Sequence, residues 1–317
     1  VLEDDVENGI DVLSDMMLHS LIEPAELKRE ESVVVEEIKR GEDEPSEHVH
    51  DLHLERRWQG HPLGKPVIGT RESVSGFQRS DLTAYMDRRY RGGNVLLAVA
   101  GKVDPEKVHA CSREILGKIP PGGEDGELPR PSGEGGLCEV AKDVEQVHFC
   151  IGTDGASLYD ADLYTQIVMD AALGGSMSSR LFQEIREKRG LVYTVGSYSL
   201  NYTAGGVYTV YGGTSPDKWD EVQEVTRTEF DKVMAHGFEP DELERTKRHI
   251  SGNLVLALEG MSGRMMRMSK NEMFHHRDIP IEETLGKVSA VTNEQIIDLA
   301  RRILPEERVS TTVIGPS

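Results

Sequence analysis

Hydrophobic residues recur at helical spacing on either side of a motif that occurs twice in the chain. Glu-Pro-x-Glu-Leu-x-Arg stands at Glu23–Arg29 and again at Glu239–Arg245. In residues 15–38 and 230–254, each copy follows one amphipathic stretch and precedes another, which predicts a helix on each side of the motif. Matched flanks of this kind indicate an internal duplication.

A regular order of elements is predicted after the middle of the chain. Alternation of apolar and polar residues from Leu137 predicts a strand. Residues 163–173 predict a helix, which Gly174 and Gly175 end. The helix that follows ends at Gly190, and a run of β-branched and aromatic residues then begins a hairpin.

The first half predicts elements of the same kinds. Residues 94–103 are an apolar run that predicts a buried strand, and residues 104–119 predict a helix with Asp104 as its N-cap. The Gly- and Pro-rich residues 120–136 predict an exposed linker. Strand followed by helix, with hairpins elsewhere, indicates an α+β fold rather than a helical bundle.

The duplication sets the expected domain boundaries. The two motifs are offset by 216 residues (239 − 23), so the first copy's counterpart of Leu137 falls roughly 80 residues before Val1. We therefore expect residues 1–119 to be the remainder of a first domain that is truncated at its start. Residues 137–317 are expected to be the second copy.

Two glutamates share one face of the helix predicted over residues 24–40. Glu30 and Glu37 are seven positions apart and project within roughly 20° of one another, along the apolar stripe of that helix. Carboxylates on a core-facing stripe need a metal, another cation or an arginine beside them. The alternative is a solvated edge. The second copy has the neutral residues Thr246 and Asn253 at the matching positions, as expected if one copy carries a charged site.

An arginine and a tyrosine flank the predicted helix–strand corner at Gly190. Arg186 lies in the last turn of a helix that Ser178 or Ser179 is expected to cap, and Tyr193 lies early in the next strand. Both side chains donate hydrogen bonds, so together they could stabilise negative charge on oxygen during acyl transfer. The alternative is a surface arginine beside a half-buried hairpin tyrosine.

The charge of the chain narrows the classes of partner. Its formal net charge is −20, and an acidic surface repels nucleic-acid phosphates and anionic lipids, so neither nucleic acid nor membrane is expected as a partner. No apolar run approaches the roughly 20 residues that span a bilayer. No targeting segment is recognisable, so the cytoplasm is the expected compartment.

The cysteines and histidines form neither a disulfide framework nor a recognisable metal motif. Cys111, Cys138 and Cys150 are expected to be free, mostly buried thiols. The histidines number 11, and no two of them are four positions apart, so the helical two-histidine metal geometry is absent. The cluster in residues 48–53 is expected to be a solvated helix face rather than a metal site.

Three segments resemble the insulinase/pitrilysin family of zinc peptidases, especially its short members of the mitochondrial-processing-peptidase kind. Ser179–Tyr193 resembles part of the family's C-terminal domain, and Val33–Ile38 resembles the helix that supplies its third zinc ligand. His61–Gly64, followed by Ile68–Thr70, is similar to a family signature. The resemblance covers essentially the whole chain and implies two homologous α+β domains of the LuxS/processing-peptidase type. Each would be a mainly antiparallel sheet with helices packed on one side.

The resemblance also implies roles for four residues. Glu37 would be the glutamate ligand of a catalytic Zn²⁺, and Glu30 would be a nearby acid that supports the metal site. Arg186 and Tyr193, contributed by the inactive second domain, would bind the substrate and stabilise its oxyanion.

One expected motif does not occur in the chain. The family's His-x-x-Glu-His should lie roughly 75 to 80 residues before Glu37, which is upstream of Val1. The chain is therefore expected to be a fragment of a zinc-dependent metalloendopeptidase that cleaves peptides or presequences, inactive alone and unable to hold Zn²⁺ stably. The alternative is a non-catalytic subunit or a peptide-binding scaffold. Either function implies peptide ligands and a homodimer or heterodimer with a related peptidase chain.

Overall fold

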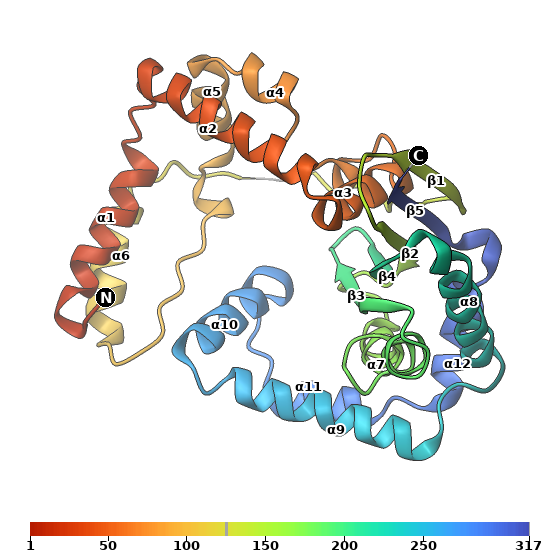
Figure 1. Ribbon diagram of the computed structural model, residues 1–317. Helices are drawn as coiled ribbons and strands as arrows, with labels where there is room; N and C mark the ends of the chain where they lie inside the picture. The colour runs from red at the N-terminus through yellow and green to blue at the C-terminus, as the bar shows by residue number, and fades with distance from the viewer. Residues whose placement is uncertain (124–125, 317) are drawn as a thin grey trace. The chain divides into compact units, whose positions relative to one another are not determined.

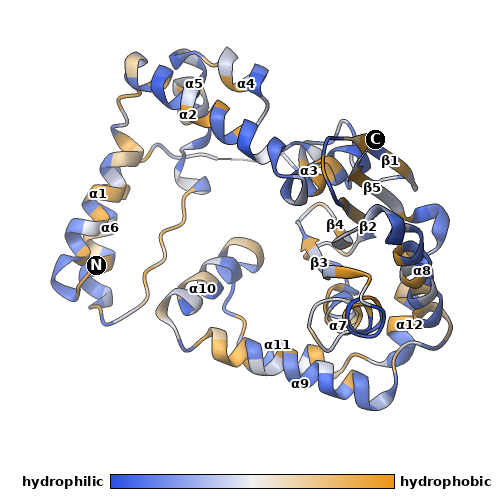
Figure 2. Cartoon of the chain, viewed as in Figure 1, coloured by the Kyte–Doolittle hydropathy of each residue, from blue (hydrophilic) through white to orange (hydrophobic). Residues whose placement is uncertain are grey.

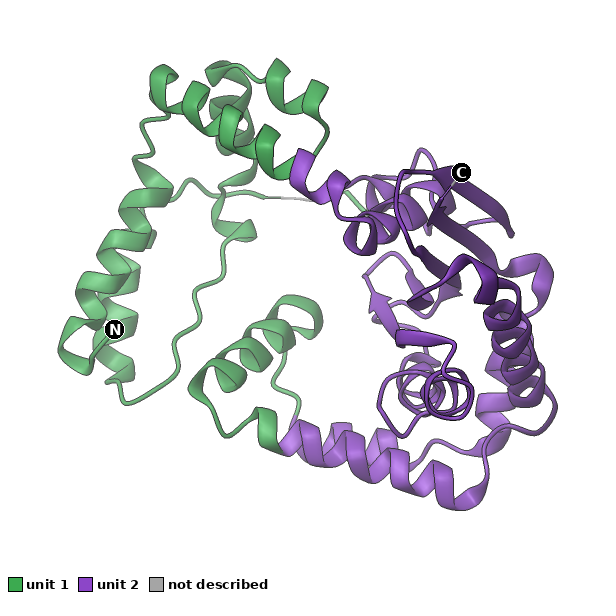
Figure 3. Ribbon diagram, in the orientation of Figure 1, with its two compact units in different colours: residues 1–38, 69–127, 256–279 green, residues 39–68, 128–255, 280–317 purple. Residues whose placement is uncertain are grey.

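The computed structural model of the chain describes residues 1–123 and 126–316, which form two compact units (Figure 3). Unit 1 comprises residues 1–38, 69–127 and 256–279, and unit 2 comprises residues 39–68, 128–255 and 280–317. This division follows spatial compactness. The boundaries expected from the duplication concern homology between domains, and they stay a prediction.

A five-stranded sheet forms the core layer of unit 2 (Figure 1). Its spatial order is β1-β5-β2-β4-β3, with β1 and β5 parallel and the other neighbouring pairs antiparallel. The strands are β1 (Gly136–Ala141), β2 (Val147–Gly155), β3 (Val192–Asn201), β4 (Gly206–Thr214) and β5 (Ser310–Gly315). The expected α+β class, with a mainly antiparallel sheet, is confirmed.

Successive side chains of β2 point to opposite faces of this sheet, and each face packs against different helices. Phe149 and Ile151 belong to the main core, whereas Cys150 between them joins a smaller cluster with Val49 and Ile314. The main core is covered by α7 (Leu163–Leu173), α8 (Trp219–His236), α11 (Ile281–Ser289) and α12 (Asn293–Ile303). Figure 2 shows hydrophobic residues on the strands and, mixed with polar ones, on α8 and α12 beside them.

The opposite face of the sheet is covered by α3 (Pro45–Arg57), so the expectation of helices on one side needs correction. The expected solvated face over residues 48–53 is also wrong, because His53 is 0 % exposed. Its Nδ1 atom lies 3.1 Å from the Thr312 hydroxyl. Burial, reinforced by the charge of Arg57, lowers the pKa of His53 to about 3. The histidine is therefore a neutral core residue at physiological pH.

An ion pair between a buried arginine and a half-buried aspartate joins α3 to the sheet. The Arg57 side chain is 1 % exposed, and its Nε donates to the Asp154 carboxylate at 2.9 Å. The same carboxylate accepts the Trp58 indole N–H at 2.9 Å and the Gly133 amide at 2.9 Å. Arg57 Nη1 also donates to the Ser310 hydroxyl at 2.9 Å. One acid on β2 thus holds a helix, a loop and, through Arg57, the start of β5.

The other helices include both helices that begin at the repeated motif. Pro24 and Pro240 are the first residues of α2 and α9, and in each helix the leucine amide of the motif donates to its first glutamate's carbonyl. The Leu27–Glu23 bond is 2.9 Å long and the Leu243–Glu239 bond is 3.0 Å long. The two copies therefore start their helices in the same way. The helices are α1 (Val6–Leu18), α2 (Pro24–Asp43), α4 (Arg71–Gly76), α5 (Arg79–Arg89), α6 (Pro105–Leu116), α9 (Pro240–Ala257) and α10 (Met261–His275).

Short helical turns complete the structure. They are η1 (Glu3–Asp5), η2 (Pro62–Gly64), η3 (Gly92–Asn94), η4 (Phe182–Glu187), η5 (Pro216–Lys218) and η6 (Glu306–Arg308), of which η4 is π-helical and the others are 3₁₀. No helix among the described residues is both long and apolar enough to cross a bilayer.

The predicted buried strand over residues 94–103 is wrong. The stretch is extended between η3 and α6, but within the described part of the chain it joins no ladder and is not buried. An apolar run becomes a strand only when another strand pairs with its backbone. The helix predicted next is confirmed, because the Asp104 side chain accepts the amides of Glu106 and Lys107 at 3.0 and 3.4 Å.

The predicted linker over residues 120–136 is exposed for most of its described length, and residues 124–125 lie outside the described ones. Its second part is nevertheless anchored, because Arg130 pairs with Asp160 at 2.7 Å and Gly133 donates to Asp154. The three cysteines are free as expected. Cys150 is buried, but Cys111 and Cys138 are only half-buried.

Arg57→Ala should lower the free energy of unfolding of unit 2 by about 2 kcal/mol, because the Asp154 carboxylate and two carbonyl groups lose their charged donor. Both tryptophans, Trp58 and Trp219, lie in unit 2. Urea unfolding followed by tryptophan fluorescence therefore reports on this unit. Arg56→Ala, on the exposed side of the same helix, is the matched control and should change the value by less than about 0.5 kcal/mol. Equal effects of the two variants would contradict a structural role for the ion pair.

Candidate functional site

The Gly174–Gly175 turn ties the end of α7 to β3. Both glycine amides donate to the Asp170 carbonyl at 2.9 Å, and the Ser197 amide donates to the Gly174 carbonyl at 3.1 Å. A Cβ atom on Gly174 would collide with the backbone and side chain of Ser197. Glycine is therefore required there for the close approach of the two segments.

The helix predicted between this turn and Gly190 is short and irregular. Its last part, η4, is π-helical, and the Lys188 amide donates to the Gln183 carbonyl five residues back at 2.9 Å. The expected serine cap is wrong, because the Ser179 hydroxyl donates to the Ser176 carbonyl at 2.5 Å instead of accepting a helix amide. Single π-helical turns occur often at functional sites.

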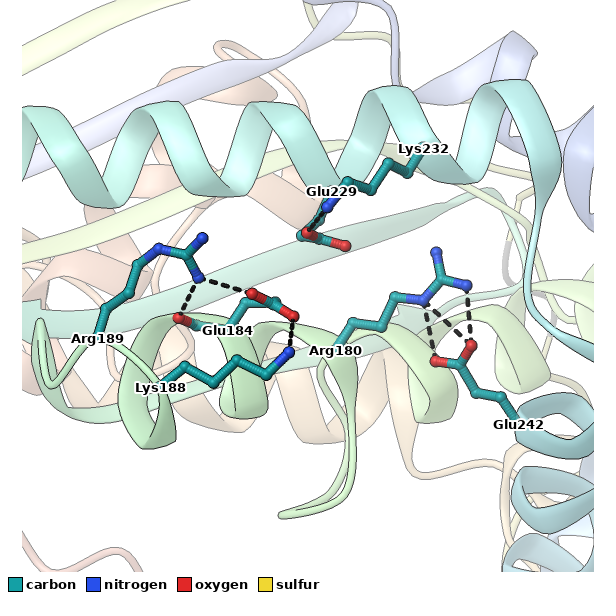
Figure 4. A network of polar contacts seen from close by, with 7 residues as sticks. All are labelled: Arg180, Glu184, Lys188, Arg189, Glu229, Lys232 and Glu242. Carbon is teal, nitrogen blue, oxygen red and sulfur yellow. Dashed lines mark hydrogen bonds and ion pairs between the residues drawn. The ribbon is translucent and has the colours of Figure 1, made fainter.

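A bidentate ion pair holds the start of this segment against α9. Arg180 donates to Glu242 through Nε at 2.9 Å and through Nη2 at 2.8 Å, and both side chains are 17 % exposed (Figure 4). The Arg180 guanidinium also lies 4.4 Å from the centroid of the Phe238 ring. Sequence reasoning missed this pair. Glu242 is the second glutamate of the repeated motif, which was the available signal.

A second network holds the end of the segment. Glu184 accepts from Lys188 at 2.5 Å and from Arg189 at 2.6 Å (Figure 4). The hydrogen bond from Lys188, followed by the one from Arg189, lowers the pKa of the Glu184 carboxyl. The Lys218 ammonium donates to the Gly190 carbonyl at 3.0 Å. The corner between η4 and β3 is therefore fixed at both ends.

Arg186 and Tyr193 come together at this corner, as their spacing predicted. The Arg186 guanidinium carbon lies 5.4 Å from the centroid of the Tyr193 ring and 4.8 Å from that of Phe182. Tyr193 is the extra residue of a β-bulge, since Val192 pairs with Thr214 and Thr194 with Gly213. It is 81 % exposed, so it is not the half-buried hairpin tyrosine of the alternative reading.

Glu30 and Glu37 lie on α2 in unit 1, and both are exposed. The expectation that they project along a core-facing stripe is therefore wrong, since only Ile38 of that stripe is buried. The physical reason is that a carboxylate without a buried cation remains in water. Their roles at a metal site stay predictions. Arg186 and Tyr193 belong to the other unit.

The described residues do not fit a complete zinc site. Residues 1–123 and 126–316 contain no group of three or more His, Cys, Asp or Glu side chains that could hold a metal. Zinc sites in proteins use three or four such ligands. Of the four predicted site residues, only Glu37 was expected to bind the metal directly, so the donor set is incomplete.

Comparisons with known proteins agree with the resemblance in the sequence. The family model for insulinase (peptidase family M16) matches residues 1–71, and the model for the peptidase M16 inactive domain matches residues 76–250. An uncharacterized zinc protease of Bacillus subtilis, YmxG, is 34 % identical over 317 residues, covering 100 % of this chain and 77 % of that protein. An uncharacterized zinc protease of Streptomyces coelicolor is 33 % identical over 330 residues, covering 100 % of this chain and 70 % of that protein.

Solved structures show the same fold. A peptidase M16 inactive domain from Pseudomonas fluorescens superposes with a TM-score of 0.89 at 19 % identity, covering 99 % of this chain and 76 % of that chain. This likeness confirms the fold, and the family models with the curated relatives confirm the expected family. With an inactive-domain match over residues 76–250 and a relative that is 34 % identical over the whole length of this chain, the chain belongs to peptidase family M16, the insulinase family of zinc metallopeptidases.

Proposed function

We propose that this chain supplies the substrate-binding part of a zinc metalloendopeptidase of the processing-peptidase type, and that Arg186 and Tyr193 contact the substrate. The observation that carries the proposal is the cation–π contact of the Arg186 guanidinium with the Tyr193 ring at an exposed corner. The substrates would be peptides or presequences. Relatives that bear the name zinc protease support the reaction class.

The corner suits a peptide because its donors remain available. Within the described residues the Arg186 guanidinium stacks on two rings, and its nearest acid, Glu187, is 4.0 Å away, beyond hydrogen-bond distance. Its N–H groups can therefore donate to carbonyl oxygens of an extended peptide, and the exposed Tyr193 hydroxyl can donate beside them. Contact with two aromatic rings restricts the guanidinium, which reduces the entropy lost on binding.

Cleavage would need metal ligands beyond those that this chain assembles. We propose that Glu37 is one zinc ligand, that Glu30 supports it, and that histidine ligands come from residues outside this sequence or from a related chain in a homodimer or heterodimer. The metal donors would then lie in unit 1 or a partner, and the substrate donors in unit 2.

The second candidate function is a non-catalytic subunit or peptide-binding scaffold. The match of residues 76–250 to the family's inactive domain favours it. Both functions require peptide binding by Arg186 and Tyr193. They differ in whether adding the missing ligands, or an active partner chain, produces cleavage that depends on Glu37.

Arg186→Ala should weaken the binding of a fluorescein-labelled extended peptide by about tenfold or more, because a hydrogen bond from a charged donor contributes about 1.5–3 kcal/mol. Tyr193→Phe should weaken it by about threefold, since it removes one neutral donor and keeps the ring. Fluorescence anisotropy of the labelled peptide, titrated with the whole chain, measures both affinities.

The matched controls are Arg245→Ala, at an exposed position of α9, and Tyr159→Phe, at another exposed tyrosine of unit 2. Neither should change the affinity by more than about twofold. If all four variants bind alike, the peptide does not contact the corner, and the proposed function loses its basis.

Zinc titration should show no stoichiometric binding to the chain by itself, because one glutamate is too small a ligand set. Isothermal calorimetry and metal analysis after dialysis measure this. Glu37→Gln should leave any weak zinc uptake unchanged. A tight 1:1 complex that Glu37→Gln abolishes would show that this chain completes a zinc site unaided, contrary to the expectation.

A further inference from the structure

Asp170 lies at the base of the loop that carries Arg186 and Tyr193. Its carbonyl accepts the amides of Gly174 and Gly175, and its carboxylate accepts a short hydrogen bond from the Ser197 hydroxyl. Ser197 in turn donates its amide to the Gly174 carbonyl at 3.1 Å. One residue thus binds both the turn at which the loop begins and the strand into which it returns.

The loop between these contacts contains two irregularities of the backbone, the π-helical turn η4 and the β-bulge at Tyr193. From Gly175 the chain runs through the π-helical turn with Arg186, reaches the bulge at Tyr193 and arrives at Ser197 four residues later. Any shift of β3 against the turn therefore moves the two donors relative to one another. The Asp170–Ser197 hydrogen bond is one side-chain contact that opposes such a shift.

Among residues 1–123 and 126–316, no Lys, Arg or His side chain forms an ion pair with Asp170. The group facing it from β4 is Tyr208, a fully buried phenol whose pKa is raised by burial and then by the charge of Asp170. The cations of the helices that pack on α7 have other partners. Lys287 of α11 pairs with Glu283 at 2.9 Å, and Arg302 of α12 pairs with Asp162 at 2.8 Å.

We propose that Asp170 is a positioning residue for peptide binding. Its ionised carboxylate holds β3 against the Gly174–Gly175 turn and so keeps Arg186 and Tyr193 in fixed positions relative to one another. Protonation of the carboxylate replaces a charge-assisted hydrogen bond by a weaker neutral one and loosens the loop. The inference rests on the proposed function, because it concerns the same corner.

The titration of Asp170 falls in an accessible pH range. Burial raises the pKa of its carboxyl to about 6, against the lowering effect of the serine hydrogen bonds. Because the pKa in the folded state is raised above 3.8, the group's contribution to stability is full below about pH 4 and is lost as the pH rises through 6. Peptide binding should change in the opposite direction, increasing as the carboxylate ionises. If Asp170 had only a structural role, peptide affinity and folding stability would change with pH in the same direction.

The test measures peptide affinity of the whole chain between about pH 5 and pH 8, with a fluorescein-free, environment-sensitive label on a peptide that lacks histidine. Wild type should bind about three- to tenfold more weakly at the acid end. Asp170→Asn, which fills the same space without titrating, should bind weakly at every pH with a flat profile. Ser197→Ala removes the donor and should behave in the same way. Asp231→Asn, at an exposed position of α8, is the matched control and should keep the wild-type profile.

Hydrogen exchange of residues 174–197, corrected for the intrinsic pH dependence, tests the positioning without any peptide. At pH 8, Asp170→Asn and Ser197→Ala should exchange faster in this segment than wild type, and wild type at pH 5 should resemble the variants. Should no peptide bind at any pH, the proposed function fails, whereas faster exchange in the variants would still support the clamp. Wild-type exchange in both variants, or a wild-type pH profile in Asp170→Asn, would overturn the inference.

Discussion

The amide of Ser197 donates to the carbonyl of Gly174, and the Arg186–Tyr193 corner lies inside the loop that this hydrogen bond closes. The bond requires glycine at position 174, because a side chain there would occupy the space of Ser197. Between the two residues the backbone leaves regular geometry twice, in a π-helical turn and in a β-bulge. Arg186 lies in the first irregularity and Tyr193 in the second. The backbone between is held by the ion pair of Arg180 with Glu242 of α9 and by that of Lys188 with Glu184. The corner is thus an exposed site on a rigid support, which is the usual arrangement for recognition.

The sheet of unit 2 illustrates a different use of charge. Arg57 and Asp154 form a pair in which the arginine is almost wholly enclosed and the carboxylate has three donors. Such pairs contribute little net stability compared with an apolar packing, but they allow one geometry only. Here that geometry sets how α3 lies on the sheet. His53, neutral and buried one turn earlier, shows that this helix is a part of the core and not a metal-binding surface.

Much of this arrangement could be predicted from local sequence. The helix over Leu163–Leu173, the Gly-Gly turn, the hairpin after Gly190 and the Asp104 cap depend on neighbouring residues, and all are present. The meeting of Arg186 and Tyr193 was predicted because one lies in the last turn of a helix that ends at Gly190 and the other lies early in the strand that follows. The π-helical turn, the bulge and the Arg180–Glu242 pair could not be predicted, since each depends on contacts made across the fold. The prediction of a strand over residues 94–103 was wrong for the same reason, because an apolar run does not specify the strand that pairs with it.

The place of β5 has a consequence for synthesis. Residues 310–315 occupy an interior position of the sheet, between β1 and β2, and Ser310 pairs with Gly136. β1 and β2 are therefore synthesised long before β5, the strand that must lie between them. During translation the β1 and β2 edges facing that gap stay open until residue 315 has left the ribosomal tunnel. A nascent chain of this kind offers unpaired backbone to other chains for much of its synthesis, so it would be a natural client for chaperones that shield strand edges.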